Sequence, residues 1–381
     1  MAKTKTRSRA KKTLSREIGL PTIQAYKDAP QLSTLIRKLK KQPKVTVCAP
    51  VYNGGEYFRQ MLASVLAQDY GDFKVLVIDN CSTDDTPEIV KSFNDSRIKY
   101  VRNDRNLGAC GNWNRCIELA KGQYIAIFHC DDLYYRNIVS REAEFLDRNP
   151  DAAAVFTSAD IISSDGKKLD ELNLPGQFAS EKIACLRDIV DFTVSKGYEP
   201  LICPTFMVRR SAAARCGFFD CKGLLLAFDM DYYFRLFDLG TIGFLKQRLM
   251  GYRKHVTQGS LRYNDKMDTQ DEHFRILEHA MKSKGIVLDE KKMARFQADR
   301  RFRKTIDALG HAYAGNRARA FEITKASFKA GDAFLDFPSM KRIVISCFEF
   351  SFLLSQYLFA GKLFAGLFLG LMQSYRRHRT K

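Results

Sequence analysis

The sequence has none of the cysteine patterns that mark a metal-binding or disulfide-rich protein. Its 381 residues include ten cysteines, but these are scattered, with no CxxC pair and no histidine–cysteine ladder at zinc spacing. The first residues also lack the charged, apolar and small-residue regions of a secretory signal peptide. We therefore expect free thiols in a reducing cytoplasm.

The glycine-rich phosphate-binding motifs of two common nucleotide-binding folds are absent. A dinucleotide-binding fold needs GxGxxG after its first strand, and Gly54-Gly55 does not supply it. A Walker loop is missing as well. A bound nucleotide would therefore be held by groups other than a glycine cradle.

A long uninterrupted apolar stretch is also missing. Phe, Leu and Ile dominate residues 343–372, but Glu349 and Lys362 interrupt them, and the longest charge-free run among these residues is Phe350 to Gly361. Such a run is too short for an independent membrane-spanning helix. Three interpretations stay open: a helix pair packed on the body, an anchor in the membrane interface, and a true span.

Positive charge, in contrast, is plentiful. The formal net charge is +19, and residues 1–12 carry six Lys or Arg and no acidic residue. The last six residues add four more basic side chains. This balance favours phosphate-bearing partners such as anionic lipids or nucleotide diphosphates. For residues 1–12 alone, a solvated tail is an equal alternative. Because no RNA- or DNA-binding motif accompanies the charge, we do not expect a nucleic-acid partner.

Apolar runs alternate with helical patterns through the first half of the chain. Short β-type runs occur at residues 45–50, 74–79, 98–101 and 124–128, and helical spacing lies between them. This alternation predicts an α/β fold with a central, mostly parallel sheet. In such sheets ligands bind beyond the carboxyl ends of the strands. Polar residues follow three of the runs at this edge, in Pro50–Glu56, Asp79–Asp85 and His129–Asp132.

Several of these segments resemble, in order, the family 2 glycosyltransferases with the GT-A fold. The resemblance covers roughly residues 44–262 and rests on Ala49-Pro50-Val51-Tyr52-Asn53, Val77–Asp84, Arg105-Asn106-Leu107-Gly108 with Asn112 and Asn114, Gly122–Ala126 running into Asp131-Asp132, Ile202–Arg210, Gly217–Asp220 with Phe228–Arg235, and Gly251–His255. Two positions depart from the family pattern. His129 stands where the metal motif often begins with Asp, and Phe228 stands where the acceptor side often has Glu.

The resemblance implies a metal ion at the end of the fourth run. Mg²⁺ or Mn²⁺ would neutralise the charge that builds up on a nucleotide diphosphate leaving group. Asp131 is the expected ligand, with Asp132 supporting it or binding through water. A helix cap is the alternative for this pair. His129 is expected either to contact the ribose or diphosphate or simply to pack.

The resemblance also implies a donor pocket. Asp79 would accept hydrogen bonds from the nucleotide base, and Pro50, Tyr52 and Glu56 would line the base and ribose pocket. Asn80, Ser82 and Asp84 are expected to shape the loop instead. The further donor contacts expected are Arg105, Asn112, Arg253 and His255, with Arg253 alternatively an ordinary ion-pair partner.

Asp229 holds the position of the family's general base, which removes the proton of the acceptor hydroxyl. In-line attack then inverts the anomeric carbon. A helix N-cap is the alternative role for Asp229, and Asp231 is expected to be structural.

The sequence thus predicts four segments: a basic tail and lead-in (1–43), a GT-A catalytic domain (44–265), a helical extension (266–340) and an apolar helical segment with a basic end (341–381). The expected activity is metal-dependent, inverting transfer from a nucleotide sugar to a glycan or lipid-linked acceptor, in cell-surface glycan or glycolipid synthesis. A catalytically inactive donor-binding or scaffold protein is the alternative. The expected location is the cytoplasm, and peripheral contact with the anionic cytoplasmic face of the membrane stays open.

Overall fold

The structure is a computed structural model that describes residues 42–178, 183–256, 258, 271–313 and 315–327. The chain divides into two units, Met1–Lys44 and Val45–Lys381, and almost all described residues lie in the second. The apolar segment 343–372 and both basic ends lie outside the described residues. The boundaries of the four predicted segments stay predictions.

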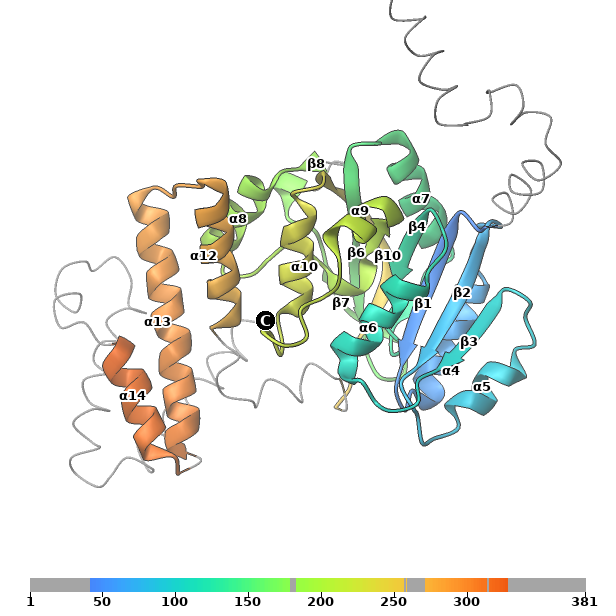
Figure 1. Cartoon of the computed structure of the whole chain (residues 1–381), viewed down its shortest axis with the longest axis horizontal. Helices are drawn as coiled ribbons and strands as arrows, with labels where there is room; N and C mark the ends of the chain where they lie inside the picture. Colours follow the sequence, from blue (N-terminus) through green and yellow to red (C-terminus); the bar gives the residue numbers. More distant parts are fainter. Residues whose placement is uncertain (1–41, 179–182, 257, 259–270, 314, 328–381) are drawn as a thin grey trace, which may run out of the picture. The chain divides into compact units, whose positions relative to one another are not determined.

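A single sheet organises the second unit (Figure 1). Its strands lie in the order β3-β2-β1-β4-β9-β6-β10-β5, with β7 beside β6 and β8 beside β10. Their bounds are β1 Val45–Val51, β2 Phe73–Asp79, β3 Ile98–Arg102, β4 Tyr124–Ile127, β5 Leu133–Tyr134, β6 Ala152–Ile162, β7 Lys168–Leu172, β8 Ile183–Ala184, β9 Met207–Arg209 and β10 Thr241–Arg253.

Most strands on the main path of this sheet run in one direction. β1 is parallel to β2 and β4, and β2 is parallel to β3. β9 is antiparallel to both β4 and β6, so β6 runs the same way as β4, and β10 runs parallel to β6. The α/β class and the mostly parallel sheet expected from the sequence are confirmed.

Helices cover both faces of the sheet, as the strand sequences require. Every residue of β1 is buried, which is typical of a parallel strand covered on both sides. Successive residues alternate between two apolar layers: Val75 and Val77 of β2 belong to one, Leu76 and Ile78 to the other. The helices are α4 Gly55–Leu66, α5 Thr86–Ser92, α6 Gly108–Leu119, α7 Ile138–Arg148, α8 Leu186–Lys196, α9 Arg210–Cys216, α10 Phe228–Leu236, α12 Glu272–Lys284, α13 Glu290–Tyr313 and α14 Arg317–Ser327, with short 3₁₀ turns η1 Gly176–Phe178 and η2 Cys203–Thr205.

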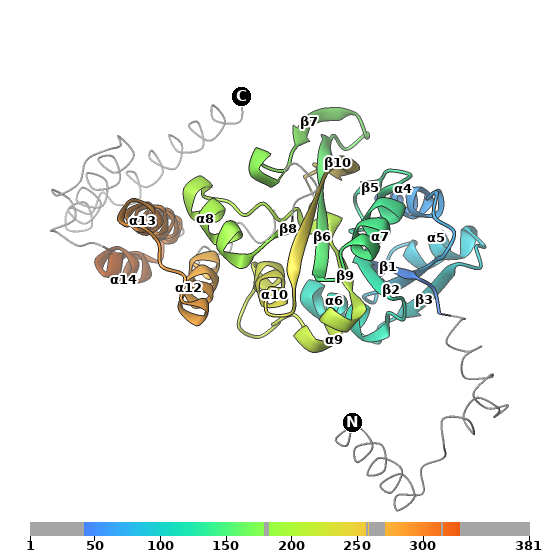
Figure 2. The ribbon, with the colours of Figure 1, turned by 90° about the horizontal axis from the view of Figure 1, so that it is seen from above.

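The two apolar layers assign the helices to faces. The layer with Val75 takes its helical residues from α4, α5 and α7, and the layer with Leu76 takes them from α6, α8, α9, α10, α12 and α13. Figure 2 shows α7 and α8 on opposite sides of β6 and β10. The site described below lies at the carboxyl ends of the parallel strands β1, β2 and β4.

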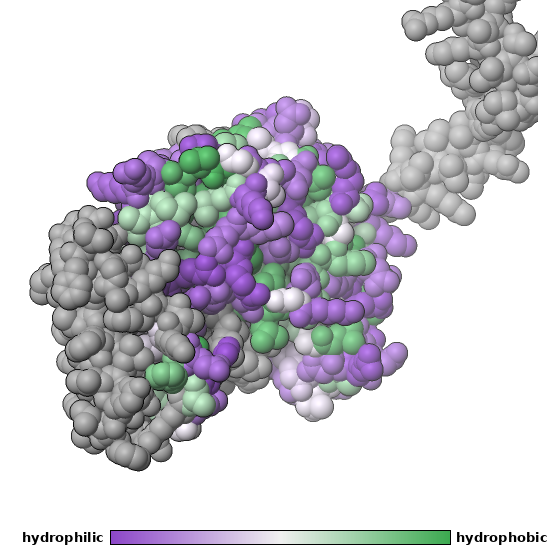
Figure 3. All heavy atoms as spheres, turned by 60° about the vertical axis from the view of Figure 1, so that its left-hand side comes forward, coloured by the Kyte–Doolittle hydropathy of each residue, from purple (hydrophilic) through white to green (hydrophobic). Residues whose placement is uncertain are grey.

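The helices after β10 continue the second layer. Phe274 of α12 and Phe296 of α13 are buried, with ring centroids 5.4 Å apart. Arg300 of α13 donates to both carboxylate oxygens of Asp271, at 2.7 and 2.9 Å. Within the described ranges, each helix is too short or too polar to cross a bilayer. On the face drawn in Figure 3, hydrophilic residues surround smaller groups of hydrophobic ones.

One expectation about the cysteines was wrong. Cys110 and Cys221 form a disulfide, with Cα atoms 5.6 Å apart and 111 residues between them in sequence. Cys110 lies on α6 and Cys221 on the loop between α9 and α10, so the fold brings together two residues that no local spacing connects. Free thiols are found at Cys48, Cys81, Cys116, Cys130, Cys185, Cys203 and Cys216.

Candidate active site

The segments that follow β1, β2 and β4 meet at one edge of the sheet. Val51 at the end of β1 lies opposite Asp79 at the end of β2, and the Asn80 N–H donates to the Val51 carbonyl at 2.8 Å. On the other side of β1, the Phe128 N–H donates to the Cys48 carbonyl at 2.9 Å. The strand order alone therefore brings three polar segments, distant in sequence, to a common edge.

A group of possible metal ligands follows β4. One ligand atom from each of His129, Asp131 and Asp132 lies within 4.8 Å of the others. Asp132 is only 1% exposed, and its Oδ1 accepts the Arg253 N–H at 2.7 Å. Its other oxygen, Oδ2, is buried without a hydrogen-bond partner among the described residues. Burial raises the pKa of Asp132 well above its ordinary value, and the charge of Asp131 acts in the same direction.

These residues fit a divalent cation. A buried carboxylate oxygen without a donor is costly, and a cation bound to Oδ2 would remove that cost. Mg²⁺ and Mn²⁺ both accept carboxylate oxygens and are commonly held by one or two carboxylates together with substrate phosphates. Asp131 and Asp132 are therefore suited to the role that the sequence predicts for them.

Arg253, the last residue of β10, holds the segment His129–Asp132 in place. The side chain is fully buried, and its Nε donates to the Asp131 carbonyl at 2.8 Å. Nη1 donates to the Ser164 carbonyl at 2.7 Å and Nη2 to Gln60 Oε1 at 2.9 Å. Because all three nitrogens are bound within the protein, Arg253 acts here as a clamp. Its contact with the donor stays a prediction.

His255 lies directly against Asp131. Its Nε2 is 3.0 Å from Asp131 Oδ2, and its ring lies 4.8 Å from that of Tyr57. The Arg253 guanidinium lies 4.7 Å from the same Tyr57 ring. Tyr57 therefore packs against both of these residues, of which Arg253 holds the Asp131 carbonyl and His255 contacts its carboxylate.

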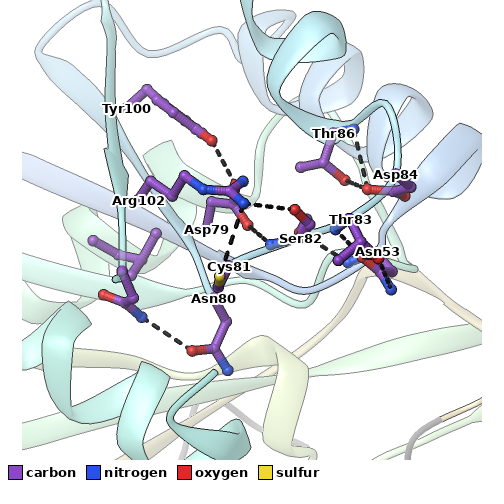
Figure 4. A network of polar contacts seen from close by, with 12 residues as sticks. Asn53, Asp79, Asn80, Cys81, Ser82, Thr83, Asp84, Thr86, Tyr100 and Arg102 are labelled. Atoms are coloured by element: carbon purple, nitrogen blue, oxygen red, sulfur yellow. Dashed lines mark hydrogen bonds and ion pairs between the residues drawn. The ribbon is translucent and has the colours of Figure 1, made fainter. Parts of the chain in front are cut away.

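Asp79 lies at the centre of a hydrogen-bond network (Figure 4). The side chain is fully buried; Oδ1 accepts the Ser82 N–H at 2.8 Å, and Oδ2 accepts from Tyr100 Oη at 2.5 Å and Arg102 Nη1 at 2.8 Å. Burial alone would raise the pKa of Asp79, but the hydrogen bonds from Ser82 and Tyr100 and the Arg102 charge outweigh it, so that pKa is lowered. Contact with a nucleotide base, which stays a prediction, would have to replace or share one of these partners.

The loop after Asp79 is held to the turn after β1, as expected for Ser82 and Asp84. Ser82 Oγ accepts the Asn53 N–H at 2.9 Å (Figure 4). Asp84 Oδ2 accepts the Gly55 N–H at 3.1 Å. Asn53 has a positive φ of 51°, a conformation that Asn tolerates better than most residues. These contacts fix the two turns against each other.

The other predicted donor contacts differ in their surroundings. Tyr52 is 42% exposed at this edge, and Pro50 is buried within β1. Glu56 is exposed and pairs with Arg59 on α4 at 3.4 Å. Arg105 is exposed on the loop between β3 and α6. Their roles stay predictions.

Asn112, by contrast, is buried and joins α6 to the sheet. Its Nδ2 donates to the Ile78 carbonyl at 3.0 Å, and its Oδ1 accepts from Asn103 Nδ2 at 2.9 Å. Donor contact by Asn112 stays a prediction, but the hydrogen bonds of this side chain are structural.

Asp229 lies in the first turn of α10, after the N-cap residue Ala227. Its Oδ1 accepts the Met230 N–H at 2.8 Å. Burial raises the pKa of Asp229, as does the nearby charge of Glu199, while a hydrogen bond with Cys203 lowers it. Asp231, expected to be structural, pairs with Arg235 at 2.9 Å.

Cys203 connects Asp229 to the metal group. Besides its hydrogen bond with Asp229, its Sγ lies 3.7 Å from His129 Nε2 and 3.1 Å from Tyr233 Oη. The structure thus brings the predicted base close to the predicted metal loop, through a residue for which the sequence suggested no role.

The loop before α10 has an anchor that sequence patterns could not indicate. Glu272, the first residue of α12, is 3% exposed. Its carboxylate accepts the N–H groups of Leu225, Leu226 and Ala227 at 2.9, 2.9 and 2.8 Å. Glu272 lies 43 positions beyond Asp229, outside every motif quoted above, so only the folded chain reveals it.

The fold and the site together define an α/β protein with carboxylates gathered at the ends of its parallel strands. Comparison with known proteins shows a likeness to one family: residues 46–217 match the model described as "Glycosyl transferase family 2". Over these residues the chain is similar to family 2 glycosyltransferases, in agreement with the resemblance found in its sequence.

Two bacterial relatives are similar over part of this region. The putative teichuronic acid biosynthesis glycosyltransferase TuaG of Bacillus subtilis is 30% identical over 159 residues, which are 39% of this chain and 63% of TuaG. The putative colanic acid biosynthesis glycosyl transferase WcaA of Escherichia coli is 36% identical over 104 residues, which are 27% of this chain and 37% of WcaA. The chain thus spans less than two thirds of either relative.

Among solved structures, S. aureus TarS (residues 1–349, in complex with UDP-GlcNAc) is similar with a TM-score of 0.49 and 17% sequence identity. The likeness covers 78% of this chain and 95% of that one.

Proposed function

We propose that this protein is a metal-dependent, inverting glycosyltransferase that moves a sugar from a nucleotide-diphosphate sugar to an acceptor hydroxyl. The observation that carries the proposal is the group formed by His129, Asp131 and Asp132, next to the acidic residue Asp229. Within the part of the chain that the structure describes, one buried carboxylate oxygen of this group has no hydrogen-bond partner. The match of residues 46–217 to the family 2 model supports the proposal.

Asp131 and Asp132 would hold the cation, which is Mn²⁺ or Mg²⁺. When bound, such an ion supplies a Lewis acid that neutralises charge developing on the diphosphate. The chain's own contribution is to fix the two carboxylates. Arg253 holds Asp131 by its carbonyl and Asp132 by its carboxylate, and His255 orients the Asp131 side chain.

Asp229 is proposed as the general base. A general base works best when its pKa approaches the working pH, and burial raises the pKa of Asp229 above the ordinary value of 3.8. The acceptor hydroxyl would give its proton to this carboxylate as it attacks the anomeric carbon, with inversion.

The names of TuaG and WcaA place those two proteins in the synthesis of teichuronic and colanic acid. By extension, we propose that the present chain takes part in the synthesis of a cell-surface glycan or glycolipid. Its acceptor would be a glycan or a lipid-linked molecule. Peripheral contact with the cytoplasmic face of the membrane belongs to the same proposal.

An inactive donor-binding or scaffold protein is the second candidate. The observation in its favour is Asp79, whose two carboxylate oxygens are already bound by Ser82, Tyr100 and Arg102. Such a protein would bind nucleotide and release no nucleoside diphosphate from any nucleotide sugar.

Thermal unfolding with UDP, GDP and dTDP, each with and without Mn²⁺, tests the donor site. A ligand at about 100 times its dissociation constant adds roughly 2.7 kcal/mol to the free energy of unfolding. We expect one nucleotide to raise the melting temperature only with Mn²⁺, and Asp131→Asn to abolish the shift. Asp170→Asn, on exposed β7, is the matched control and should keep it. A shift that survives in Asp131→Asn would refute the site.

A further inference from the structure

The metal group contains a nitrogen ligand at a position where the family pattern often has a carboxylate. His129 shares the 4.8 Å cluster with Asp131 and Asp132, so the group offers one imidazole nitrogen and two carboxylate oxygens. A set of one nitrogen and two oxygen ligands influences which cation the site prefers.

The ring of His129 is held by aromatic packing. It lies 5.1 Å from the ring of Trp113 on α6. Its backbone N–H donates to Tyr134 Oη at 2.6 Å, and Tyr134 in turn stacks on Phe128 at 3.8 Å and donates to the Pro204 carbonyl at 3.2 Å. Ring packing and the backbone hydrogen bond therefore hold the imidazole in place, with little help from hydrogen bonds of its ring nitrogens.

The ring nitrogens have only a weak partner in the described part of the chain. The contact of Nε2 is Cys203 Sγ at 3.7 Å, and a thiol is a poor hydrogen-bond donor and acceptor. Asp132 Oδ2, in the same group, is buried and lacks a partner within the described residues. The group thus offers a cation an imidazole with a weak partner and a carboxylate oxygen that is buried without one among the described residues.

We propose that His129 is a direct ligand of the donor-binding cation and makes the site prefer Mn²⁺ over Mg²⁺. This proposal rests on the metal site of the proposed function. Mg²⁺ strongly favours oxygen ligands in a strict octahedron, whereas imidazole nitrogen suits transition ions, and Mn²⁺ accepts a mixed nitrogen and oxygen set. The role of His129 thus sets the choice of metal, beyond the binding that Asp131 and Asp132 supply.

A direct test is pulsed electron paramagnetic resonance of Mn²⁺ bound to the full-length protein. Coordination by His129 should give a ¹⁴N coupling in the wild type that disappears in His129→Asp. His255→Gln is the matched control, because His255 also lies near Asp131, and it should keep the coupling. Bound Mn²⁺ without a ¹⁴N coupling in the wild type would overturn the proposal, whether or not the variants fold.

Metal preference can be measured through Trp113, which is the only tryptophan of the chain and lies against His129. Binding of paramagnetic Mn²⁺ should quench its fluorescence, and Mg²⁺ should restore the signal by competition. In His129→Asp the preference for Mn²⁺ over Mg²⁺ should fall by at least roughly tenfold, the lower end of the effects seen for changes around metal sites. An unchanged ratio would refute the assignment.

Failure here can be told apart from failure of the proposed function. If sugar transfer proceeds with either ion while His129→Asp keeps the wild-type preference, only the role of His129 is wrong. If Asp131→Asn binds Mn²⁺ as the wild type does, the metal site itself is misplaced, and both proposals fail.

Discussion

Replacing Glu272 by glutamine perturbs the loop that leads into the helix of Asp229. The Glu272 carboxylate accepts three backbone N–H groups, from Leu225, Leu226 and Ala227, at 2.8–2.9 Å. Its negative charge also lies near the N-terminus of α10, where a helix favours anions. An amide would place an NH₂ group against at least one of these donors.

The expected loss follows from these contacts. A hydrogen bond to a charged group contributes about 1.5–3 kcal/mol, and water can replace part of it at the partly exposed Leu225 and Leu226. We therefore expect Glu272→Gln to lower the free energy of unfolding by about 2–4 kcal/mol. At roughly 2–4 °C per kcal/mol, the melting temperature should fall by about 4–16 °C.

Differential scanning fluorimetry and urea unfolding measure this change. Glu278→Gln is the matched control, because Glu278 lies on the same helix but forms an exposed pair with Arg300. Such a pair contributes about 0–1 kcal/mol. If the two variants lose equal stability, the anchoring role of Glu272 is refuted.

Three further predictions concern Glu142, Arg253 and the disulfide. Glu142 of α7 is fully buried, neither of its oxygens has a partner among the described residues, and burial raises its pKa well above the ordinary 4.5. The folded protein thus keeps a proton on Glu142 that the unfolded chain loses. This carboxyl therefore lowers the free energy of unfolding more and more as the pH rises above the pKa that Glu142 has in the unfolded chain. Glu142→Gln should raise the free energy of unfolding in urea more at about pH 8 than at about pH 5; an equal gain at both would contradict this. Arg253→Lys cannot reproduce the hydrogen bonds that the three guanidinium nitrogens donate, and it should weaken Mn²⁺ binding about 10–100-fold in a fluorescence titration. An unchanged affinity would be the contrary result. Cys110→Ser should lower the free energy of unfolding of the unreduced protein by roughly 2–5 kcal/mol. A dithiol reductant should lower the melting temperature of the wild type and leave that of the variant unchanged. Equal sensitivity of the two proteins to the reductant would show that Cys110 and Cys221 are not paired.

Much of the sheet could be predicted because its strands carry their own signal. β1 and β2 are short apolar runs bounded by turn residues, and helical spacing lies between them. The position of Asp131 and Asp132 followed from the same rule, since residues after parallel strands meet at one edge. Local sequence was sufficient for these features.

The remaining features depend on contacts between distant parts of the chain. Arg253 contacts the Asp131 carbonyl, which lies 122 positions away in sequence. Its side chain is fully buried, whereas an arginine at the end of a strand is usually exposed. Cys203 lies inside a motif but acts through contacts with His129 and Asp229 that only the fold creates. The Cys110–Cys221 pairing is of the same kind, because no spacing rule relates two cysteines in unrelated elements.

The most direct measurement of the central claim is the release of nucleoside diphosphate from a panel of nucleotide sugars, with Mn²⁺, by wild type and Asp229→Asn. The wild type should turn over one donor. Asp229→Asn should lose at least about a hundredfold in rate, the lower end of general-base contributions, while its Mn²⁺-dependent thermal shift with the nucleotide persists. Turnover that is unchanged in Asp229→Asn, or absent with every donor in the wild type, would contradict the proposed glycosyl transfer.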